Sequence, residues 1–362
     1  MALKTKKEYI QSIKKLNREI YLFGEKVNDP TENPIIRPSI NAIGETYKLA
    51  EEKEHQDLMV TESSLTGNKI NRFLHLHQNT EDLVNKVKML RLLGQKTATC
   101  FQRCVGMDAV NALDTVTYEM DQNLSTNYHD NFTRYLEYCQ NNDLVMDGAM
   151  TDPKGDRSLR PNQQEDLDMF LHVVEEKSDG IIVRGAKVHQ TGALNSHEII
   201  VMPTMAMSEK DKEYAVSFAI PSDTDNLTYI YGRQSCDKRK LEKGDLDVGN
   251  FKYGGQECII IFDDVFVPNE RIFLNGAYKY AGMLVQRFAG YHRQSYGGCK
   301  VGVGDVLIGA AALIAEYNGV SDASHIKNKL TEMIHLNETL YSCGIACSKE
   351  GCPMSSGTYL ID

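Results

Sequence analysis

The chain has 362 residues, with 40 Lys and Arg against 50 Asp and Glu, which gives a formal net charge of −10. This acidic balance excludes a general nucleic-acid-binding protein, which needs a basic footprint, and it argues against docking on an anionic membrane surface. The length predicts two or three domains, and no apolar stretch reaches the roughly 18 residues of a membrane span.

The N-terminus and the cysteine count both indicate a cytoplasmic protein. Residues 1–17 contain charges but no apolar centre, so they predict an amphipathic helix and not a signal peptide. The nine cysteines are an odd number, and a disulfide framework is not expected in a reducing compartment. The thiols are therefore expected to bind a metal, to take part in redox chemistry or to lie in the core.

The first part of the chain, up to about residue 143, has a helical pattern. Between Glu81 and Val105, apolar and small residues recur at spacings of three and four, which predicts one helix with one buried face. That face includes Cys100 and Cys104. The two thiols are therefore expected on the same side of this helix, one turn apart.

From about Met146 to Phe273 the pattern changes to strands. β-branched and aromatic runs broken by turn residues predict strands in GIIVRGAKV, HEIIVMPTM, YAVSFAIP, LTYIYGR and ECIIIFDDVFVP. From Gly276 a helical pattern returns, and VGVGDVLIGAAALIAEYNG predicts a long buried helix. This order predicts an α+β fold, with an N-terminal helical domain (1–145), a middle β domain (146–275) and a C-terminal helical bundle (276–362).

A second chemically rich segment lies on the C-terminal helix, in RFAGYHRQSYGGCKVG. His292 and Cys299 are seven residues apart, which returns them to one helix face, and Tyr296 and Lys300 share that side. If this face meets Cys100 and Cys104, three thiols and one imidazole converge. Such a donor set suits either zinc or an iron–sulfur cluster. The wide separation of the two pairs favours a cofactor held between domains over a compact zinc module.

A purely structural reading stands beside this one, because a pair of cysteines on an apolar helix face is more often part of the core. Cys343, Cys347 and Cys352 have similar spacing without a His, Tyr and Lys nearby, and they are expected to lie in the core. Three isolated cysteines are also expected to be structural: Cys139, Cys236 and Cys258.

Two polar loops of the β region form a second candidate site. DGAMTDPKGDRS and HQTGALNSHE have the backbone amides and the Arg that hold a pyrophosphate or a flavin edge, although composition alone favours plain surface loops. No G-x-G-x-x-G motif opens a βαβ unit, which argues against a Rossmann fold. Glu257, at the start of an apolar strand, is either catalytic or marks the solvent end of that strand.

Six segments closely resemble the 4-hydroxybutyryl-CoA dehydratases: CFQRCVGMDA, GAMTDPKGDRS, KVHQTGALNSHE, GRQSCD, FDDVFVPNERIF and RFAGYHRQSYGGCKVG. The resemblance extends over nearly the whole chain. The wider family includes the flavin-dependent 4-hydroxyphenylacetate 3-monooxygenases, and both groups resemble the acyl-CoA dehydrogenase architecture. The resemblance therefore implies a helical domain, a β-barrel or sandwich domain and a C-terminal helical bundle.

The resemblance also assigns cofactors and site residues. It implies a [4Fe–4S] cluster on Cys100, Cys104, His292 and Cys299. It implies FAD at Met150, Thr151, Asp156, Arg157, Ser158 and Thr191. It ties His292, Tyr296, Lys300 and Glu257 to catalysis. It further implies a homotetramer, with flavin sites at subunit contacts.

The implied reaction is dehydration of 4-hydroxybutyryl-CoA to crotonyl-CoA by a flavin and iron–sulfur radical mechanism, with vinylacetyl-CoA isomerisation by the same groups. Family members extend further at the C-terminus, so the helical bundle is expected to be incomplete here and to lack a glutamate that resembles the α-proton base. Three alternatives remain: an aromatic monooxygenase on the same fold, which needs no cluster; a truncated, inactive chain; and a zinc-bound variant.

Overall fold

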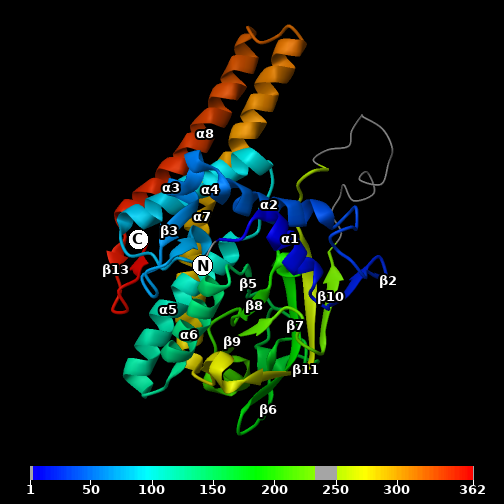
Figure 1. Cartoon of the computed structure of the whole chain (residues 1–362), viewed down its shortest axis with the longest axis vertical. Helices are drawn as coiled ribbons and strands as arrows, with labels where there is room; N and C mark the ends of the chain where they lie inside the picture. Colours follow the sequence, from blue (N-terminus) through cyan, green and yellow to red (C-terminus); the bar gives the residue numbers. More distant parts are fainter. Residues whose placement is uncertain (1–2, 233–250, 362) are drawn as a thin grey trace.

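Most helices and most strands occupy separate parts of the chain in the computed structural model, which describes residues 3–232 and 251–361 (Figure 1). The protein has an α+β architecture, as the sequence predicts. Six helices precede the main strands: α1 (Lys6–Lys14), α2 (Arg37–Glu51), α3 (Gln56–Met59), α4 (Thr80–Thr97), α5 (Cys104–Leu124) and α6 (Tyr128–Asn141). Two long helices follow them: α7 (Tyr278–Tyr317) and α8 (Ser324–Lys349).

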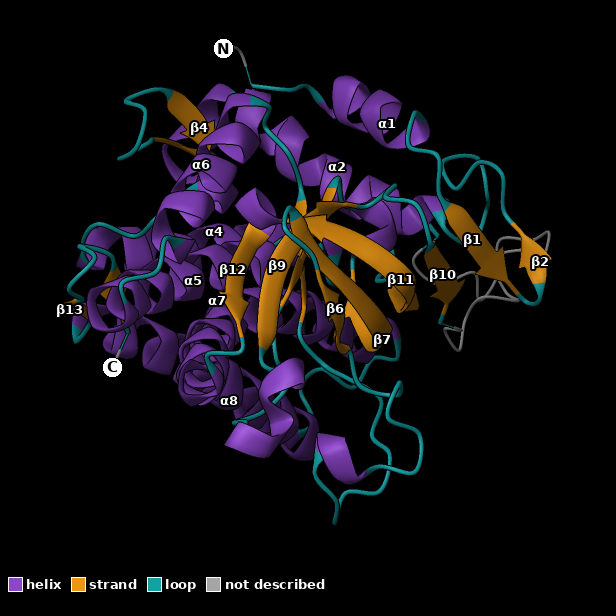
Figure 2. Cartoon of the chain, turned by 90° about the horizontal axis from the view of Figure 1, so that it is seen from below, coloured by secondary structure: helices purple, strands orange, loops and turns teal. Residues whose placement is uncertain are grey.

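The strands form two larger sheets, and in Figure 2 helices lie above these sheets and to their left. The six-stranded sheet has the order β2-β1-β10-β11-β7-β6. Its strands are β1 (Glu19–Leu22), β2 (Glu25–Lys26), β6 (His172–Glu176), β7 (Gly180–Thr191), β10 (Leu227–Tyr231) and β11 (Glu257–Pro268). The four-stranded sheet has the order β12-β9-β8-β5. Its strands are β5 (Met146–Ala149), β8 (Glu198–Val201), β9 (Val216–Pro221) and β12 (Ile272–Asn275).

The two sheets share one hydrophobic core, which includes Val183 on β7 and Val201 on β8. The β region is therefore a sandwich of two open sheets, and among the described residues neither sheet closes into a barrel. The pairing of β7 with β11 is antiparallel and places Glu257 opposite Thr191. Two small hairpins complete the strands: β3 (Val60–Glu62) with β4 (Lys69–Asn71), and β13 (Cys352–Pro353) with β14 (Tyr359–Leu360).

The N-terminal part of the chain is less purely helical than the sequence predicts. Strand β1 pairs in parallel with β10, and β2 extends the same sheet. Tyr9 and Ile13 of α1 are buried in the core that the sheets share. Residues 6–36 thus pack with the β region. Short apolar runs of this kind do not by themselves distinguish a strand that joins a distant sheet from one face of a helix.

The predicted helix from Glu81 to Val105 is wrong as a single element. Helix α4 ends at Thr97, Ala98 adopts the left-handed conformation with φ of 51°, and α5 begins only at Cys104. Cys100 therefore lies in a loop and not on a helix face. The pattern was misleading because loop residues Phe101 and Arg103 are also buried, with 1% and 2% exposure, so the periodic burial continues through the break.

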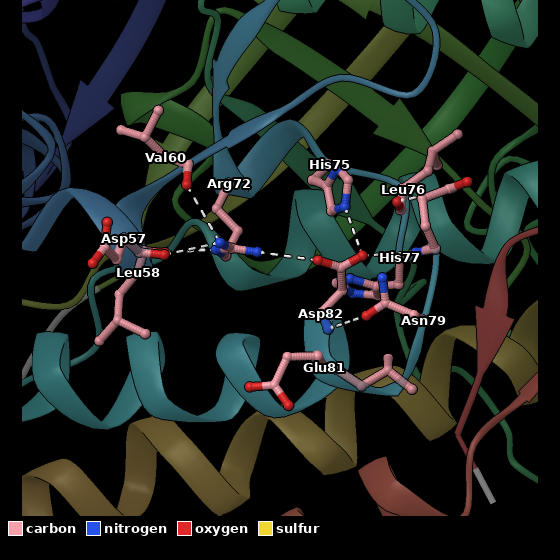
Figure 3. A network of polar contacts seen from close by, with 12 residues as sticks. Asp57, Leu58, Val60, Arg72, His75, Leu76, His77, Asn79, Glu81 and Asp82 are labelled. Atoms are coloured by element: carbon pink, nitrogen blue, oxygen red, sulfur yellow. Dashed lines mark hydrogen bonds and ion pairs between the residues drawn. The ribbon is translucent and has the colours of Figure 1, made fainter. Parts of the chain in front are cut away.

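A buried polar network anchors the start of α4 (Figure 3). The Arg72 guanidinium donates to the carbonyls of Asp57, Leu58 and Val60 and to the Asp82 carboxylate. His75 Nε2 lies 3.0 Å from the other Asp82 oxygen. Burial opposes ionisation of Asp82, but the hydrogen bond and charge of His75 and the backbone N–H of Gln78 together outweigh it and lower the pKa to about 2. The network fixes α4, the helix against which α7 packs.

Helices α4 and α7 cross at unusually short distance, because glycines meet backbone there. A Cβ on Gly298 would lie 2.4 Å from the Val87 carbonyl oxygen, and a Cβ on Gly302 would lie 2.1 Å from the Arg91 carbonyl oxygen. A Cβ on Gly94 would lie 2.6 Å from the carbonyl oxygen of Cys299. The close approach brings Cys299 beside the loop that follows α4.

The distal half of α7 is helical as predicted, but it is exposed where the sequence predicts burial. It forms a projecting hairpin with α8, drawn in orange and red in Figure 1. Leu307 is 59% exposed and Ile314 is 61% exposed. In the described part of the chain, α7 is also the one helix long and apolar enough to cross a membrane by length and composition, with 22% of that window buried. The sequence analysis expects no membrane-length apolar stretch because glycine and polar residues interrupt every apolar run, whereas the mean hydropathy over this part of α7 is high.

The cysteines outside the candidate site divide into two groups. Cys139 and Cys258 are buried, in agreement with a structural role. The prediction that Cys343, Cys347 and Cys352 belong to the core is wrong: Cys343 and Cys352 are exposed and Cys347 is half-buried. The packed face of α8 carries Gly344 and Ser348 instead, and Cys352 lies on the two-residue strand β13. Cys236 lies outside the described residues.

Candidate cofactor and active site

One cavity of about 390 Å³ brings together the two motif segments and the end of the six-stranded sheet. All four predicted metal ligands and all four predicted catalytic residues line it. The lining comprises Thr99, Cys100, Gln102, Cys104, Val105, Thr191, Gly255, Gln256, Glu257, His292, Tyr296, Cys299 and Lys300. Residues almost two hundred positions apart thus share one space, as the sequence predicts.

Helix α7 supplies one wall, and its spacing is the predicted one. His292, Tyr296, Cys299 and Lys300 all lie on this single helix and face the cavity. The His292 ring stacks on Phe288 with centroids 5.4 Å apart and meets Tyr296 edge-on at 5.2 Å. The Lys300 ammonium lies 5.5 Å from the centre of the Tyr296 ring, a cation–π distance. Tyr296 is 39% exposed, so this wall borders solvent.

The loop between α4 and α5 supplies the opposite wall, and two buried side chains fix its path. Gln102, in the left-handed region with φ of 69°, donates to the carbonyls of Ser39 and Gly254 and accepts from Asn195. The Arg103 guanidinium lies between the rings of Tyr47 and Phe73 at 4.6 and 4.8 Å. These anchors hold Cys100 and Cys104 in place without a helix between them.

The donor set fits a thiophilic metal group. Burial raises the pKa of the Cys104 thiol well above its ordinary value and raises that of Cys299 to about 12, and neighbouring thiols add to both shifts. Clustered thiols that resist ionisation become thiolates when a metal displaces their protons. A nitrogen of His292, the Cys104 sulfur and an oxygen of Asp108 all lie within 4.8 Å of one another.

Asp108 is the residue that the sequence reasoning missed. It lies on α5 one turn after Cys104, with no exposure, and its carboxylate lies 2.9 Å from His292 Nδ1 and 2.6 Å from Lys86 Nζ. Burial opposes its charge, but Lys86 and His292 hold its pKa below the usual value. The i, i+4 spacing from Cys104 was a visible signal, but Lys86 gave none because a buried lysine cannot be read from a sequence.

The sheet supplies the third wall. Thr191 ends β7, and Glu257 begins β11 directly opposite it. The Glu257 side chain is 50% exposed, and a carboxylate oxygen lies 4.0 Å from His189 Nδ1. The backbone N–H of Gly192 donates to the Gln256 carbonyl and side chain, which ties the two strand ends together. Glu257 therefore lies at the solvent-exposed end of its strand and also on the cavity wall. This position agrees with both readings of the residue, as a strand end and as a catalytic group.

The predicted flavin residues do not all line this cavity. Asp156 and Arg157 line a second cavity of about 320 Å³, together with Asp152, Lys154 and Thr204. The carbonyl of Thr151 accepts from the N–H of Val188 on β7. The structure thus separates the predicted set into Thr191 at the thiol-lined cavity and the loop after β5 at the second one. Met150, Thr151 and Ser158 line neither, and Ser158 donates to Asp156.

Lys187 holds the loop that carries most of these residues. It is 1% exposed, and it donates to the carbonyls of Met150 and Met202 and pairs with Asp152 at 2.8 Å. We expect Lys187→Met to cost about 3–5 kcal/mol in the free energy of unfolding, because it leaves the Asp152 carboxylate buried and unpaired. Urea unfolding measures the change in stability, and flavin quantification measures how much flavin the variant retains. The control Lys177→Met removes an exposed lysine and is expected to change little; equal stability of the two variants would contradict the assignment.

The comparisons with known proteins agree with this geometry. The family described as 4-hydroxyphenylacetate 3-hydroxylase matches in two parts, the N terminal over residues 5–274 and the C terminal over residues 281–362. The chain is also similar to the structure of a glutaryl-coenzyme A dehydrogenase, with a TM-score of 0.52 and 14% sequence identity. The match includes 77% of this chain and 64% of that one, and it shows the fold alone. The protein is thus an α+β protein with the acyl-CoA dehydrogenase type of fold. Its sequence matches the 4-hydroxyphenylacetate 3-hydroxylase family.

Two relatives are much more similar. The 4-hydroxybutyryl-CoA dehydratase/vinylacetyl-CoA-Δ-isomerase of Clostridium aminobutyricum is 64% identical over 99% of this chain and 74% of its own length. The oxygen-tolerant archaeal 4-hydroxybutyryl-CoA dehydratase from N. maritimus has a TM-score of 0.97 and 54% identity over all of this chain and 72% of that one. The chain belongs to the 4-hydroxybutyryl-CoA dehydratase family.

Proposed function

We propose that the protein dehydrates 4-hydroxybutyryl-CoA to crotonyl-CoA and isomerises vinylacetyl-CoA, as the names of its relatives state for those proteins. The observation that carries the proposal is the single cavity in which three thiols and one imidazole stand beside Thr191, Glu257, Tyr296 and Lys300. A flavin-dependent aromatic monooxygenase has no use for this donor set.

Two cofactors are proposed for the cavity and the loop beside it. Cys100, Cys104, His292 and Cys299 would hold a [4Fe–4S] cluster, for which clustered thiols and one imidazole are suitable ligands. The residues proposed for FAD are Met150, Thr151, Asp156, Arg157, Ser158 and Thr191. When bound, the flavin would supply one-electron chemistry and the iron a Lewis acid for the substrate hydroxyl. The Arg157 guanidinium is suited to a phosphate of the flavin.

The chain's own residues would carry the protons. In the overall reaction one proton leaves C2, one leaves C3, hydroxide leaves C4 and one proton returns to C4. Within reach of a substrate in the cavity, the His292 imidazole would accept the C3 proton, and Tyr296 and Lys300 would donate protons or stabilise negative charge. Among the described lining residues Glu257 carries the one carboxylate, so it would act as a further proton acceptor.

Anaerobic purification followed by measurement of iron, sulfide and flavin in one sample tests the proposal. We expect iron and sulfide in equal amounts beside FAD, and formation of crotonyl-CoA from 4-hydroxybutyryl-CoA. Flavin without iron, together with hydroxylation of a phenol, would replace the proposal with a monooxygenase. Zinc in place of iron, or neither cofactor, would also contradict it.

We also propose that the chain assembles as a homotetramer in the cytoplasm. The exposed apolar side chains of the α7–α8 hairpin, among them Leu307 and Ile314, support an assembly surface because such patches are costly to leave in water. The eight described cysteines are free thiols, in keeping with a reducing compartment. Light scattering of the full-length protein measures the assembly, and Ile314→Glu is expected to weaken it.

A further inference from the structure

Behind the cavity wall, a fully buried ion pair contacts the back of His292. Asp108 on α5 and Lys86 on α4 both have no exposed surface, and the Lys86 ammonium lies 2.6 Å from one Asp108 oxygen. The other Asp108 oxygen lies 2.9 Å from His292 Nδ1. Three helices meet at this point, since His292 is on α7. None of the sequence motifs accounts for a lysine buried there.

We infer that Asp108, held by Lys86, is a positioning residue that fixes the His292 ring so that Nε2 and not Nδ1 faces the cavity. The inference rests on the proposed function only in taking His292 as the ligand and proton acceptor. It concerns how this chain sets the orientation and the tautomer of that ring before any cofactor or substrate is present.

The hydrogen-bond inventory around Lys86 supports the first step. A lysine ammonium has three donors and no acceptor. The three groups around Lys86 Nζ are Asp108 at 2.6 Å, the Tyr291 carbonyl at 3.0 Å and Gln294 Oε1 at 2.9 Å. All three donors are used, so this side of the Asp108 carboxylate acts as an acceptor. The pairing also compensates the burial of both charges.

The second step concerns the imidazole. Asp108 Oδ2 accepts from Ser295 Oγ at 3.0 Å and faces His292 Nδ1. A carboxylate that only accepts requires a proton on Nδ1, which leaves the lone pair on Nε2. Phe288 stacks on the ring with planes 11° apart, and the Tyr296 ring meets it edge-on. Orientation and tautomer are therefore both fixed, as they are where a carboxylate supports a metal-binding histidine.

The Asp108→Asn variant tests this directly. The introduced side-chain amide has one acceptor and one donor group, and Lys86 takes the acceptor. The amide NH₂ then faces Nδ1 and favours the tautomer with the proton on Nε2, which has no lone pair for iron. We expect iron to leave the anaerobically purified full-length variant about 10-fold to 100-fold faster, on the order of other losses of a supporting carboxylate.

Two further variants isolate the effect. Asp305→Asn removes an ion pair with Arg91 that also joins α4 to α7 but makes no contact with His292, and it is expected to release iron at the wild-type rate. Lys86→Met/Asp108→Asn removes both charges, so it avoids a buried unpaired ammonium. No ammonium then holds the amide oxygen, which can turn to accept from His292 Nδ1–H, so this variant is expected to lose iron more slowly than Asp108→Asn. Iron release is followed with a chelator, and circular dichroism checks the fold. A wild-type release rate in folded Asp108→Asn would overturn the inference.

A second readout does not depend on iron. Ring-nitrogen NMR of folded, iron-free protein labelled with ¹⁵N-histidine reports which nitrogen of His292 carries the proton, and His292→Gln identifies its signals. We expect Nδ1–H in the wild type and Nε2–H in Asp108→Asn. Nε2–H in the wild type would overturn the inference. If the wild type binds no iron at all, the proposed function fails, and this spectrum still decides the role of Asp108.

Discussion

Replacement of Cys104 by alanine is expected to reduce the iron content of the anaerobically purified protein at least about 10-fold. Cys104 is 4% exposed at the start of α5, on the wall of the cavity that Cys100, Cys299 and His292 also line. Its removal leaves three donors for a group that needs four. Iron and sulfide analysis, with flavin measured in the same sample, provides the readout.

The matched control is Cys139→Ala. Cys139 is also a fully buried thiol, but it lies on α6 in a separate hydrophobic cluster. This variant is expected to keep its iron, because its thiol does not line the cavity. Full iron content in folded Cys104→Ala would remove Cys104 from the ligand set, and iron loss in both variants would point to a general packing defect.

Replacement of Gly302 by alanine is expected to lower the free energy of unfolding by about 1–3 kcal/mol and to reduce iron content. The new Cβ would lie 2.1 Å from the Arg91 carbonyl oxygen and 2.9 Å from the Gly94 Cα. Both are backbone atoms, so α4 and α7 must move apart. That movement displaces Cys299, which lies on α7 just before Gly302, from the thiols that follow α4.

Gly309→Ala is the control on the same helix. No atom lies within 4 Å of a Cβ at Gly309, so the change adds only helix propensity and is expected to stabilise the protein by up to about 1 kcal/mol. Urea unfolding of both variants measures the difference. If Gly302→Ala were as stable as Gly309→Ala, α4 and α7 would move apart without loss of stability. The close crossing of these helices would then not be needed to hold Cys299 beside the other thiols.

The sequence alone determined the type of most elements and predicted which residues of the two motif segments share the cavity. The strand from Glu257 to Pro268 has the predicted limits, because a β-branched run between turn residues has few other stable conformations. The spacing of His292, Tyr296, Cys299 and Lys300 placed them on one helix wall, since helical periodicity is a local property. The specific motif around Cys299 indicated the family before any fold was known.

Tertiary structure decided what local patterns do not encode. The break between Thr97 and Cys104 depends on buried contacts of Gln102 and Arg103 with distant segments. Because these loop residues are buried, the helix-like spacing of buried residues continues beyond the end of α4. The exposure of the α7–α8 hairpin likewise depends on what packs against it, because apolar composition states only a preference for burial. The support of His292 by Asp108 and Lys86 required three helices to meet, since a charged residue becomes internal only when the fold supplies its partner.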